Sequence, residues 1–336
     1  MVTLKMIAQR CDLSIAAVSK ALNYQPGISP DKAKWVREMA HEMGYHPNAA
    51  AQTMRTSRSM NIGFVFQNEL AHEFFSQVLE SARDYIEKKG YDITFLSSRG
   101  GSDMSYLDHA MRRSCDGVII AQGLYDKEEI RKLAESEIPC VSIDQIFNGR
   151  TAVVSDNAQS MQKIVEYLYG LGHRRIAMIH GERGEVTQMR LAGFYHACRE
   201  LRIELPPEYV VEAKFQEPRD SGQATRRLLA LKERPSCILY PDDISYLGGL
   251  TEIEHQGLSI PNDISCFGYD GIRLASLLRP TLATYRQNAE EMGLQSAKEL
   301  LSAIEDPRYY IPRVITVNGH VQPGGTVKDL NQSSRL

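Results

Sequence analysis

Cysteine is scarce in this sequence and forms no recognisable pairs. No C-x-x-C motif of the kind that binds zinc or exchanges disulfides is present. Most cysteines lie within apolar runs, as Cys237 does in the run Cys237–Leu239. We therefore expect reduced thiols buried in the core of a cytosolic protein. The six are Cys11, Cys115, Cys140, Cys198, Cys237 and Cys266.

Long apolar segments are also missing. No apolar run approaches the roughly 18 residues that a membrane-spanning helix needs. The first residues are interrupted by polar side chains and lack the apolar stretch of a secretory signal peptide. The sequence therefore predicts a cytoplasmic protein without a membrane partner.

The motifs of common enzyme classes are absent as well. The sequence contains no G-x-S-x-G or H-E-x-x-H motif, no Walker loop and no dinucleotide-binding fingerprint. The run Gly181–Gly184 has too few glycines at the wrong spacing, and the nine histidines are dispersed. We expect no enzyme, no metal site and no cofactor. An enzyme on a doubly wound scaffold is the alternative from another class, and turnover of a sugar would reveal it.

Charge is divided unequally along the 336 residues, a length that suggests two or three domains. Residues 1–58 hold eight Lys and Arg against four Asp and Glu, whereas the remainder holds 31 against 38. A basic head on an acidic body is typical of a protein that contacts phosphates at one end only.

The head has the pattern of a helix-turn-helix. A first amphipathic segment begins at Thr3, a turn falls at residues 11–13, and a second segment, with Ser14 as its N-cap, runs to Asn23. Asp12 in the turn tolerates the left-handed backbone conformation better than most residues. Such a unit places its second helix in the major groove of DNA.

Two further segments complete this region. A third helix is expected from about Asp31 to Met43, ended by Gly44, and it closes a small three-helix core. In residues 47–58, Pro47 blocks continuation of that helix and the following residues favour a short helix of their own. Because so few residues do not form a stable helix alone, we expect this segment to order only when a partner holds it.

From about residue 61 short apolar runs alternate with longer amphipathic stretches, a pattern that predicts parallel sheets with crossover helices. Two such units in tandem would enclose a cleft at the carboxyl ends of their strands. Expected helices include 162–170, 189–202, 222–231 and 246–256. Strands are expected at 62–66, 92–96, 117–120, 140–143, 175–180, 209–213, 237–240 and 265–268.

An ordered set of motifs resembles the LacI/GalR (lactose-repressor) family of bacterial transcription regulators along nearly the whole chain. Each motif is weak alone, but the set at these spacings is specific. The motifs are Leu4-Lys5-x-Ile7-Ala8 with Val18-Ser19-x-Ala21-Leu22-Asn23, Gly44-Tyr45-x-Pro47-Asn48-x-x-Ala51, Asp116–Ile120, Gly172–Ile176, Arg190–Phe194, Ile260–Ser265 with Gly268-Tyr269-Asp270, and Arg279-Pro280-x-Leu282-x-Thr284.

The resemblance implies an all-α helix-turn-helix headpiece and an α/β body like a periplasmic binding protein, with two doubly wound parallel-sheet subdomains. It also implies a homodimer, because residues 328–336 are too short for the heptads of a tetramerisation helix. We expect residues from 327 onward to form a loose tail. The implied domains are 1–46 (DNA binding), 47–58 (hinge), 59–326 (effector binding and dimerisation) and 327–336 (tail). Within the body, the N-subdomain would be about 60–157 plus 285–317, and the C-subdomain about 158–284 plus 318–326.

The resemblance also implies which residues contact an operator. Ile15 and Ala16 offer only apolar contact, as to a thymine methyl, whereas Lys20 can donate to guanine. Met54 falls where the family inserts an apolar wedge into the minor groove. The expected DNA-binding residues are Thr3, Ser14, Ile15, Ala16, Ser19, Lys20, Asn23, Asn48, Ala51 and Met54.

A second implied site is an effector cleft between the subdomains. Arg190 and Asp270 match positions that bind sugar hydroxyls, by donation and acceptance respectively. Asp242 replaces a more usual Asn beside Asp243, which admits a polyol, an aminosugar or a cationic ligand as well as a neutral sugar. The expected ligand-binding residues are Phe74, Phe75, Asp144, Arg190, Asp242 and Asp270.

The predicted function is therefore that of a regulator that binds double-stranded DNA at a pseudo-palindromic operator, and the resemblance implies that it is a repressor. A small sugar-like ligand would close the cleft and alter the spacing of the two hinges in the dimer. The alternative is a family member controlled by a protein corepressor bound on the N-subdomain surface. A panel of sugars in calorimetry would separate the two.

Overall fold

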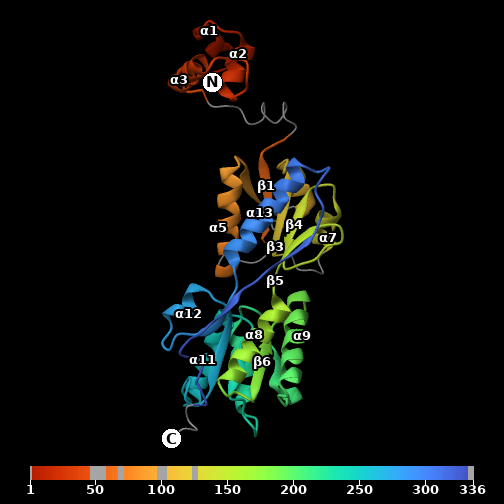
Figure 1. Cartoon of the computed structure of the whole chain (residues 1–336), viewed down its shortest axis with the longest axis vertical. Coiled ribbons are helices and arrows are strands. Elements are labelled where there is room, and N and C mark those ends of the chain that lie inside the picture. The colour runs from red at the N-terminus through yellow and green to blue at the C-terminus, as the bar shows by residue number, and fades with distance from the viewer. Residues whose placement is uncertain (1, 46–57, 67–71, 97–103, 123–127, 332–336) are drawn as a thin grey trace. The chain divides into compact units, whose positions relative to one another are not determined.

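The computed structural model describes residues 2–45, 58–66, 72–96, 104–122 and 128–331. By its internal contacts the chain divides into two units, residues 1–59 and 60–336, called here the head and the body. The predicted fold class is confirmed. The head is all helical, and the body contains two largely parallel sheets covered by helices (Figure 1).

The head contains the three expected helices, α1 (Leu4–Arg10), α2 (Ile15–Leu22) and α3 (Pro30–Glu42). The turn between α1 and α2 contains Asp12 at φ +50°, in the left-handed conformation that the sequence predicted for it. The buried side chains of the head come from all three helices and form one small cluster. They are Ile7, Ala8, Cys11, Val18, Ala21, Ala33, Val36 and Ala40.

The ends of α3 follow from local sequence. Pro30 occupies the first turn, where its missing N–H costs no helical hydrogen bond, and Asp31 places a negative charge near the helix N-terminus. After the helix, Gly44 adopts φ +69°, a conformation that glycine reaches without steric cost. The helix therefore begins and ends within one residue of the predicted bounds.

The first sheet of the body has six parallel strands in the order β11-β5-β4-β3-β1-β2. Helices α5 (Glu73–Lys88) and α13 (Ala289–Glu305) lie side by side on one face (Figure 1). Helices α6 (Tyr106–Arg112) and α7 (Glu128–Glu135) contact each other and pack with the apolar cluster of the other face. We call this sheet and its helices the N-lobe. Its strands are β1 (Asn61–Phe66), β2 (Asp92–Leu96), β3 (Gly117–Gln122), β4 (Cys140–Ile143), β5 (Thr151–Ser155) and β11 (Val314–Val317).

The second sheet, in the order β12-β10-β9-β8-β6-β7, belongs to the C-lobe and is parallel except between β10 and β12. Helices α8 (Asn157–Gly170) and α9 (Glu185–Glu200) pair with each other, as do α10 (Pro218–Leu229) and α11 (Asp243–His255). Two short helices, η1 (Pro207–Tyr209) and α12 (Arg273–Leu277), lie between strands. The strands are β6 (Ile176–His180), β7 (Val210–Glu212), β8 (Cys237–Leu239), β9 (Ser265–Asp270), β10 (Ala283–Arg286) and β12 (His320–Gln322).

The described chain passes between the two lobes three times: after β5, after β10 and after β11. Asp156 ties these passages together. Its carboxylate accepts hydrogen bonds from the Tyr285 hydroxyl (2.7 Å) and the Gly319 backbone N–H (3.3 Å), and it pairs with Lys163 at 2.7 Å. The carboxylate is nearly fully buried, so these partners offset the cost of removing its charge from water.

All eight expected strands are present, with bounds that differ by at most two residues. Strands β5, β10, β11 and β12 were not predicted. Strands β10 and β12 are short and contain Arg or His, whereas β5 (TAVVS) and β11 (VITV) are β-branched runs that the strand pattern could have indicated. The expectation of a loose tail is wrong for residues 327–331. Leu330 donates its N–H to the Leu171 carbonyl at 2.8 Å, and Asn331 donates from Nδ2 to the Gly170 carbonyl at 2.8 Å.

Candidate functional site

The exposed face of α2 contains the side chains that the sequence assigned to base contacts. Ile15, Ala16 and Lys20 are all exposed, and Ile15 leaves 49% of its surface open. Ser14 is the N-cap of this helix, and its Oγ accepts from the Ala17 N–H at 3.1 Å. Ile15 and Ala16 thus give this face apolar surface at the start of a capped helix, and Lys20 adds a cation near its end.

The other end of α2 is fixed by its own side chains. Asn23 donates from Nδ2 to the Ser19 carbonyl at 2.6 Å and so caps the helix. The Lys20 ammonium approaches Gly27, where a Cβ would lie only 3.1 Å from Nζ. At the start of α1, Thr3 accepts from the Met6 N–H at 3.4 Å as an N-cap. The predicted hinge residues Asn48, Ala51 and Met54 lie outside the described residues.

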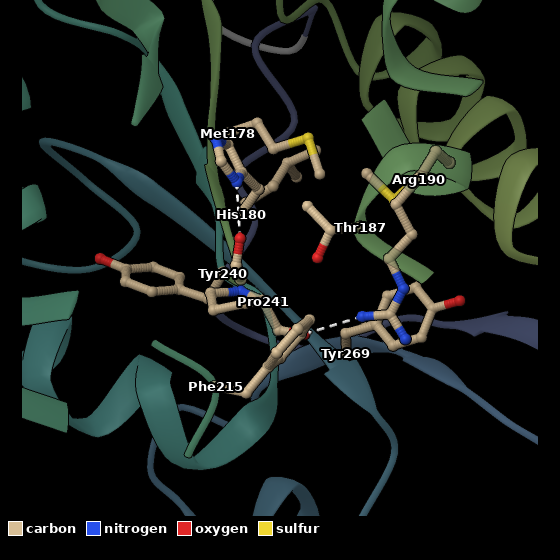
Figure 2. A pocket seen from close by; sticks show the side chains of 11 residues that line it. Met178, His180, Thr187, Arg190, Phe215, Tyr240, Pro241 and Tyr269 are labelled. Carbon is tan, nitrogen blue, oxygen red and sulfur yellow. Dashed lines mark hydrogen bonds between the residues drawn. The ribbon is translucent and has the colours of Figure 1, made fainter. Parts of the chain in front are cut away.

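A small pocket lies in the C-lobe at the carboxyl ends of its parallel strands, the edge at which open α/β sheets bind ligands. His180 ends β6, Pro241 follows β8, and Tyr269 belongs to β9. Aromatic and thioether side chains form most of the wall (Figure 2). The lining residues are Met161, Met178, His180, Gly181, Thr187, Arg190, Phe215, Leu239, Tyr240, Pro241 and Tyr269.

Arg190 is the cation of this pocket and is only 6% exposed. Its Nε donates to Asn157 Oδ1 at 2.9 Å and its Nη1 donates to the Pro241 carbonyl at 3.0 Å. The guanidinium lies 3.5 Å from the centroid of the Tyr269 ring and 5.8 Å from that of Phe215 (Figure 2). None of the ion pairs formed by the described residues includes Arg190. Neutral groups therefore orient the guanidinium through these hydrogen bonds and ring contacts.

The predicted aspartates Asp144, Asp242 and Asp270 lie near enough to this guanidinium for its charge to act on their carboxyl groups. The positive charge of Arg190 acts against burial at all three, although burial dominates and raises the pKa of each carboxyl. The structure thus brings together four of the six predicted ligand-binding residues.

Asp242 is held mainly by the protein. It is the N-cap of α11, with Oδ1 accepting from the Ser245 N–H at 2.7 Å. Its Oδ2 accepts from Ser245 Oγ at 2.8 Å and from the Gln216 N–H at 2.9 Å. With three protein donors, this carboxylate keeps little capacity for a ligand.

Asp270 and Asp144 are connected through Ser155 at the first passage between the lobes. Asp270 accepts from Gln287 Nε2 at 2.7 Å, and the Gln287 carbonyl oxygen accepts from Ser155 Oγ. The Ser155 N–H donates to Asp144 at 2.9 Å. Asp144 and Asp270 both adopt positive φ, at +56° and +101°. Such backbone strain in non-glycine residues occurs where a site requires a particular side-chain direction.

Phe74 and Phe75 follow one another at the start of α5 but differ in burial. Phe74 is 3% exposed and belongs to the N-lobe core, whereas Phe75 is partly buried. His72 lies beside them, with its ring 4.9 Å from that of Phe75. Burial, with a smaller contribution from the charge of Arg190, lowers the pKa of His72 to about 4. Its Nδ1 is buried and has no hydrogen-bond partner among the described residues.

Sequence reasoning did not select His72, Asn157 or Tyr269 as site residues. Tyr269 stood inside a quoted motif at the end of an expected strand, where the rule for parallel sheets could have indicated it. Asp243 was noted only as a neighbouring charge. It is fully buried and accepts from Thr284 Oγ1 at 2.7 Å and the Ile272 N–H at 2.9 Å, and burial raises its pKa to about 7.

Within the described ranges, no cluster of three or more His, Cys, Asp or Glu side chains is arranged to hold a metal ion. Over the same part of the chain, no helix combines the length and the apolar character needed to cross a membrane. All six cysteines are buried free thiols, as predicted.

Residues 165–327 match the family described as periplasmic binding protein-like domain. The chain is 31% identical to the probable HTH-type transcriptional repressor ExuR of Bacillus subtilis (strain 168) over 323 residues, which cover 94% of this chain and 95% of that protein. It is 30% identical over 315 residues to the HTH-type transcriptional repressor PurR of Pectobacterium atrosepticum, with 92% of each chain covered.

Among solved structures, the lac repressor dimer bound to operator and the anti-inducer ONPF superposes with a TM-score of 0.83 at 24% identity, covering 97% of this chain and 99% of that one. That likeness establishes the fold. Together with the identity to repressors along more than nine-tenths of the sequence, it leads to one conclusion. This chain belongs to the LacI family of HTH-type, DNA-binding transcriptional repressors, and its family is not one of enzymes.

Proposed function

We propose that the protein represses transcription as a homodimer, with each head placing α2 in the major groove of one half-site of a pseudo-palindromic operator. The observation that carries this proposal is the exposed face of α2, on which Ile15, Ala16 and Lys20 stand open beside the Ser14 cap. In the lac repressor structure, which has the same fold, a dimer is bound to operator.

The contacts divide by chemistry. Ile15 and Ala16 offer apolar surface to a thymine methyl, and Lys20 donates to guanine O6 or N7. The hydroxyls of Thr3, Ser14 and Ser19 can each donate a hydrogen bond to a phosphate. The Thr3 and Ser14 oxygens meanwhile accept from backbone N–H groups, and the Ser19 oxygen accepts from Asn23 Nδ2 at 3.4 Å. Asn23, whose amide is engaged at the helix end, contributes its remaining donor. Asn48, Ala51 and Met54 act in the hinge at residues 47–58, with Met54 entering the minor groove.

The proposed effector is a small hydroxyl-rich molecule, sugar-like in its chemistry, that binds at the C-lobe pocket and meets the N-lobe aromatics. Arg190 supplies donors from a buried guanidinium that has no ion-pair partner among the described residues. Asp270 and Asp144 supply acceptors, and Phe75 and Phe215 supply ring faces of the kind that pack on the C–H side of a sugar. Asp242 orients α11 and the Gln216 turn around the same ligand.

Neutral His72 extends this site. Its buried Nδ1 has no partner among the described residues, and a ligand hydroxyl at this position would satisfy it. Because the pKa of His72 is about 4, the ring is uncharged near pH 7 and can both donate and accept a hydrogen bond.

Control follows from bonds that join the lobes. Ser155, Gln287 and Asp270 form a buried chain across the passages between the lobes, and Glu73 at the start of α5 accepts from the Arg273 N–H of α12 at 2.7 Å. A ligand that contacts both lobes changes the population of their relative arrangements.

The proposed domains are residues 1–46, 47–58 and 59–326, with the body divided at about 157, 284 and 317. Because the operator lies on the chromosome, we place the protein in the cytoplasm.

Two measurements test this function. The full chain is first used to enrich duplexes of about 30 base pairs from a randomised pool, a length that holds two half-sites one helical turn apart. Enrichment of an inverted repeat supports the proposal, and enrichment of no sequence contradicts it. Titration calorimetry with a panel of sugars, sugar acids, polyols and aminosugars then tests the effector. If the protein binds the operator but none of the small molecules, the pocket assignment fails, and a protein corepressor becomes the proposed regulator of operator binding.

A further inference from the structure

Arg37 on α3 reaches back to the end of α2. Its Nη1 donates to the Ala21 carbonyl at 3.0 Å, and its guanidinium lies 4.5 Å from the centroid of the Tyr24 ring. The Arg37 side chain is partly buried, whereas Tyr24 is 80% exposed. One side chain of α3 therefore contacts Ala21 in the last turn of α2 and Tyr24 just after the C-cap residue Asn23.

The backbone at this point needs such a contact. The last carbonyls of a helix have no partner within the helix. Here the Ser19 carbonyl accepts from the Asn23 N–H at 3.1 Å and the Lys20 carbonyl accepts from the Gln25 N–H at 2.9 Å. The next carbonyl, that of Ala21, accepts from Arg37. A positive charge at a helix C-terminus also interacts favourably with the helix dipole.

The chain then turns sharply. Tyr24 adopts φ +54°, a conformation that costs energy in a residue other than glycine and persists where the surroundings hold it. The Arg37 guanidinium over the Tyr24 ring provides that hold through a cation–π contact. Lys20 precedes Ala21 directly, so the direction of the Lys20 side chain depends on how the end of α2 is fixed.

We propose that Arg37 is a positioning residue for operator recognition. It holds the carboxyl end of α2 through Ala21 and Tyr24 and thereby sets the approach of Lys20 to a base, without touching the DNA itself. This inference rests on the placement of α2 in the major groove proposed above. If the wild-type chain enriches no duplex, the proposed function itself fails. If it enriches one and Arg37→Met binds that duplex as tightly as wild type, only this inference fails.

The test compares three variants of the full chain, Arg37→Met, Arg37→Lys and Lys34→Met. Lys34 is the matched control, because it is an exposed cation of the same helix that pairs with Glu38 at 3.9 Å. Dissociation constants are measured for the duplex that the wild-type chain enriches and for a scrambled duplex of the same composition, over a series of salt concentrations.

We expect Arg37→Met to weaken binding to the enriched duplex about tenfold, the factor that corresponds to one lost charge-assisted hydrogen bond. Binding to the scrambled duplex and the slope of log K against log salt should stay unchanged. Arg37→Lys should lie between wild type and Arg37→Met, because an ammonium lacks the planar fork that both donates and stacks. Lys34→Met should leave the ratio of the two affinities unchanged.

Three results would overturn the proposal. Unchanged affinity for the enriched duplex would make Arg37 a surface residue. An equal loss on both duplexes, with the salt slope reduced by about one, would make it a phosphate contact. If Arg37→Met unfolds the head, Tyr24→Asn decides, because Asn accepts the left-handed conformation and lacks the ring that the Arg37 guanidinium contacts. Weaker binding of that variant to the enriched duplex alone supports the proposal, and binding equal to wild type rejects it.

Discussion

The head and the body place their functional residues in opposite environments. In the head, the proposed base-contacting residues Ile15, Ala16 and Lys20 are exposed on one helix and close together in sequence. In the body, Arg190, Asp242 and Asp270 are buried and come from separate strands and helices. Recognition of DNA therefore depends on a local surface, whereas recognition of an effector depends on the tertiary fold.

The two regions also differ in how they are stabilised. The head relies on a small apolar cluster and on hydroxyl caps at Thr3 and Ser14. The body has four larger apolar clusters and a buried polar network that includes Asp156 and Asp243. A small core gains less stability from burial, so truncation of one buried side chain should unfold the head more readily than the body.

The largest expected effect is that of Ile7→Ala in the head core. Ile7 is fully buried, and truncation of such a side chain costs about 2–5 kcal/mol, enough to unfold a domain of this size. Operator binding should be lost, while ligand binding in the body is retained. Gel-shift and calorimetry on the same preparation measure both. Met6→Ala, at a position 46% exposed in the same helix, is the control and should retain operator binding. Loss of both activities in Ile7→Ala would show that the two units do not fold independently.

The second effect belongs to the body alone. Arg190→Met removes a buried guanidinium that Asn157, Pro241 and Tyr269 hold in place. We expect effector affinity to fall about hundredfold, since a hydrogen bond from a charged group to the ligand would contribute about 1.5–3 kcal/mol. Operator binding without effector should persist. Arg199→Met, on the exposed side of the same helix, controls for the loss of charge. An Arg190→Met variant that binds effector as tightly as wild type would remove the pocket from the mechanism.

The difference between the head and the body explains which elements could be predicted from the sequence. The helix-turn-helix follows from adjacent residues, so periodicity and caps predicted α1, α2 and α3 closely. Eight strands were predicted by their apolar runs, whereas β10, with the residues Ala283-Thr284-Tyr285-Arg286, has no such run and is a strand because β9 and β12 pair with it. Fold class and family were accessible because the family motifs occur in order along the whole chain.

The electrostatic state of the site was not accessible in the same way. Asp242 was predicted to bind ligand from its position, but its three donors include Gln216, which lies 26 residues away in sequence. The neutral state of His72 depends on burial and on the charge of Arg190 in the other lobe. Arg37 carried no motif, and only its contact with Ala21 singles it out. Such properties arise from tertiary packing, which the pattern of residue types along the sequence does not reveal.

The third prediction concerns pH and again separates the regions. Burial raises the pKa of Asp243 to about 7, so the folded body holds a proton at pH values at which the unfolded chain has released it. The free energy of unfolding of the body should therefore fall as pH rises from about 4 to 7, by up to about 1.4 kcal/mol per pH unit. In urea unfolding, Asp243→Asn should show a smaller change of stability with pH, because Asn does not titrate. The variant should still fold, because Asn can donate to Thr284 and accept from the Ile272 N–H.

Asp263 provides the opposite control. Its exposed carboxylate accepts from Ser259, which lowers its pKa, so its stabilising contribution is lost as pH falls below the ordinary Asp range. Asp263→Asn should therefore alter stability only on the acid side. An Asp243→Asn protein with the same slope as wild type between pH 4 and 7 would show that another buried carboxyl, Asp242 or Asp270, holds the proton.

The smallest expected effect tests the bond that joins the lobes at the protein surface. Glu73 accepts from the Arg273 N–H at 2.7 Å and from Gln77 Nε2 at 3.2 Å, and Glu73→Ala removes both bonds while the residues that line the C-lobe pocket stay unchanged. Because hydrogen bonds in exposed positions contribute about 0.5–1.5 kcal/mol, effector affinity should change by two- to tenfold. Glu80→Ala, an exposed position on the same helix, should have no effect. Equal ligand affinities of Glu73→Ala and wild type in calorimetry would assign coupling between the lobes to the buried Ser155–Gln287–Asp270 chain alone, because that chain would then be the remaining polar link between the Asp144 and Asp270 sides of the site.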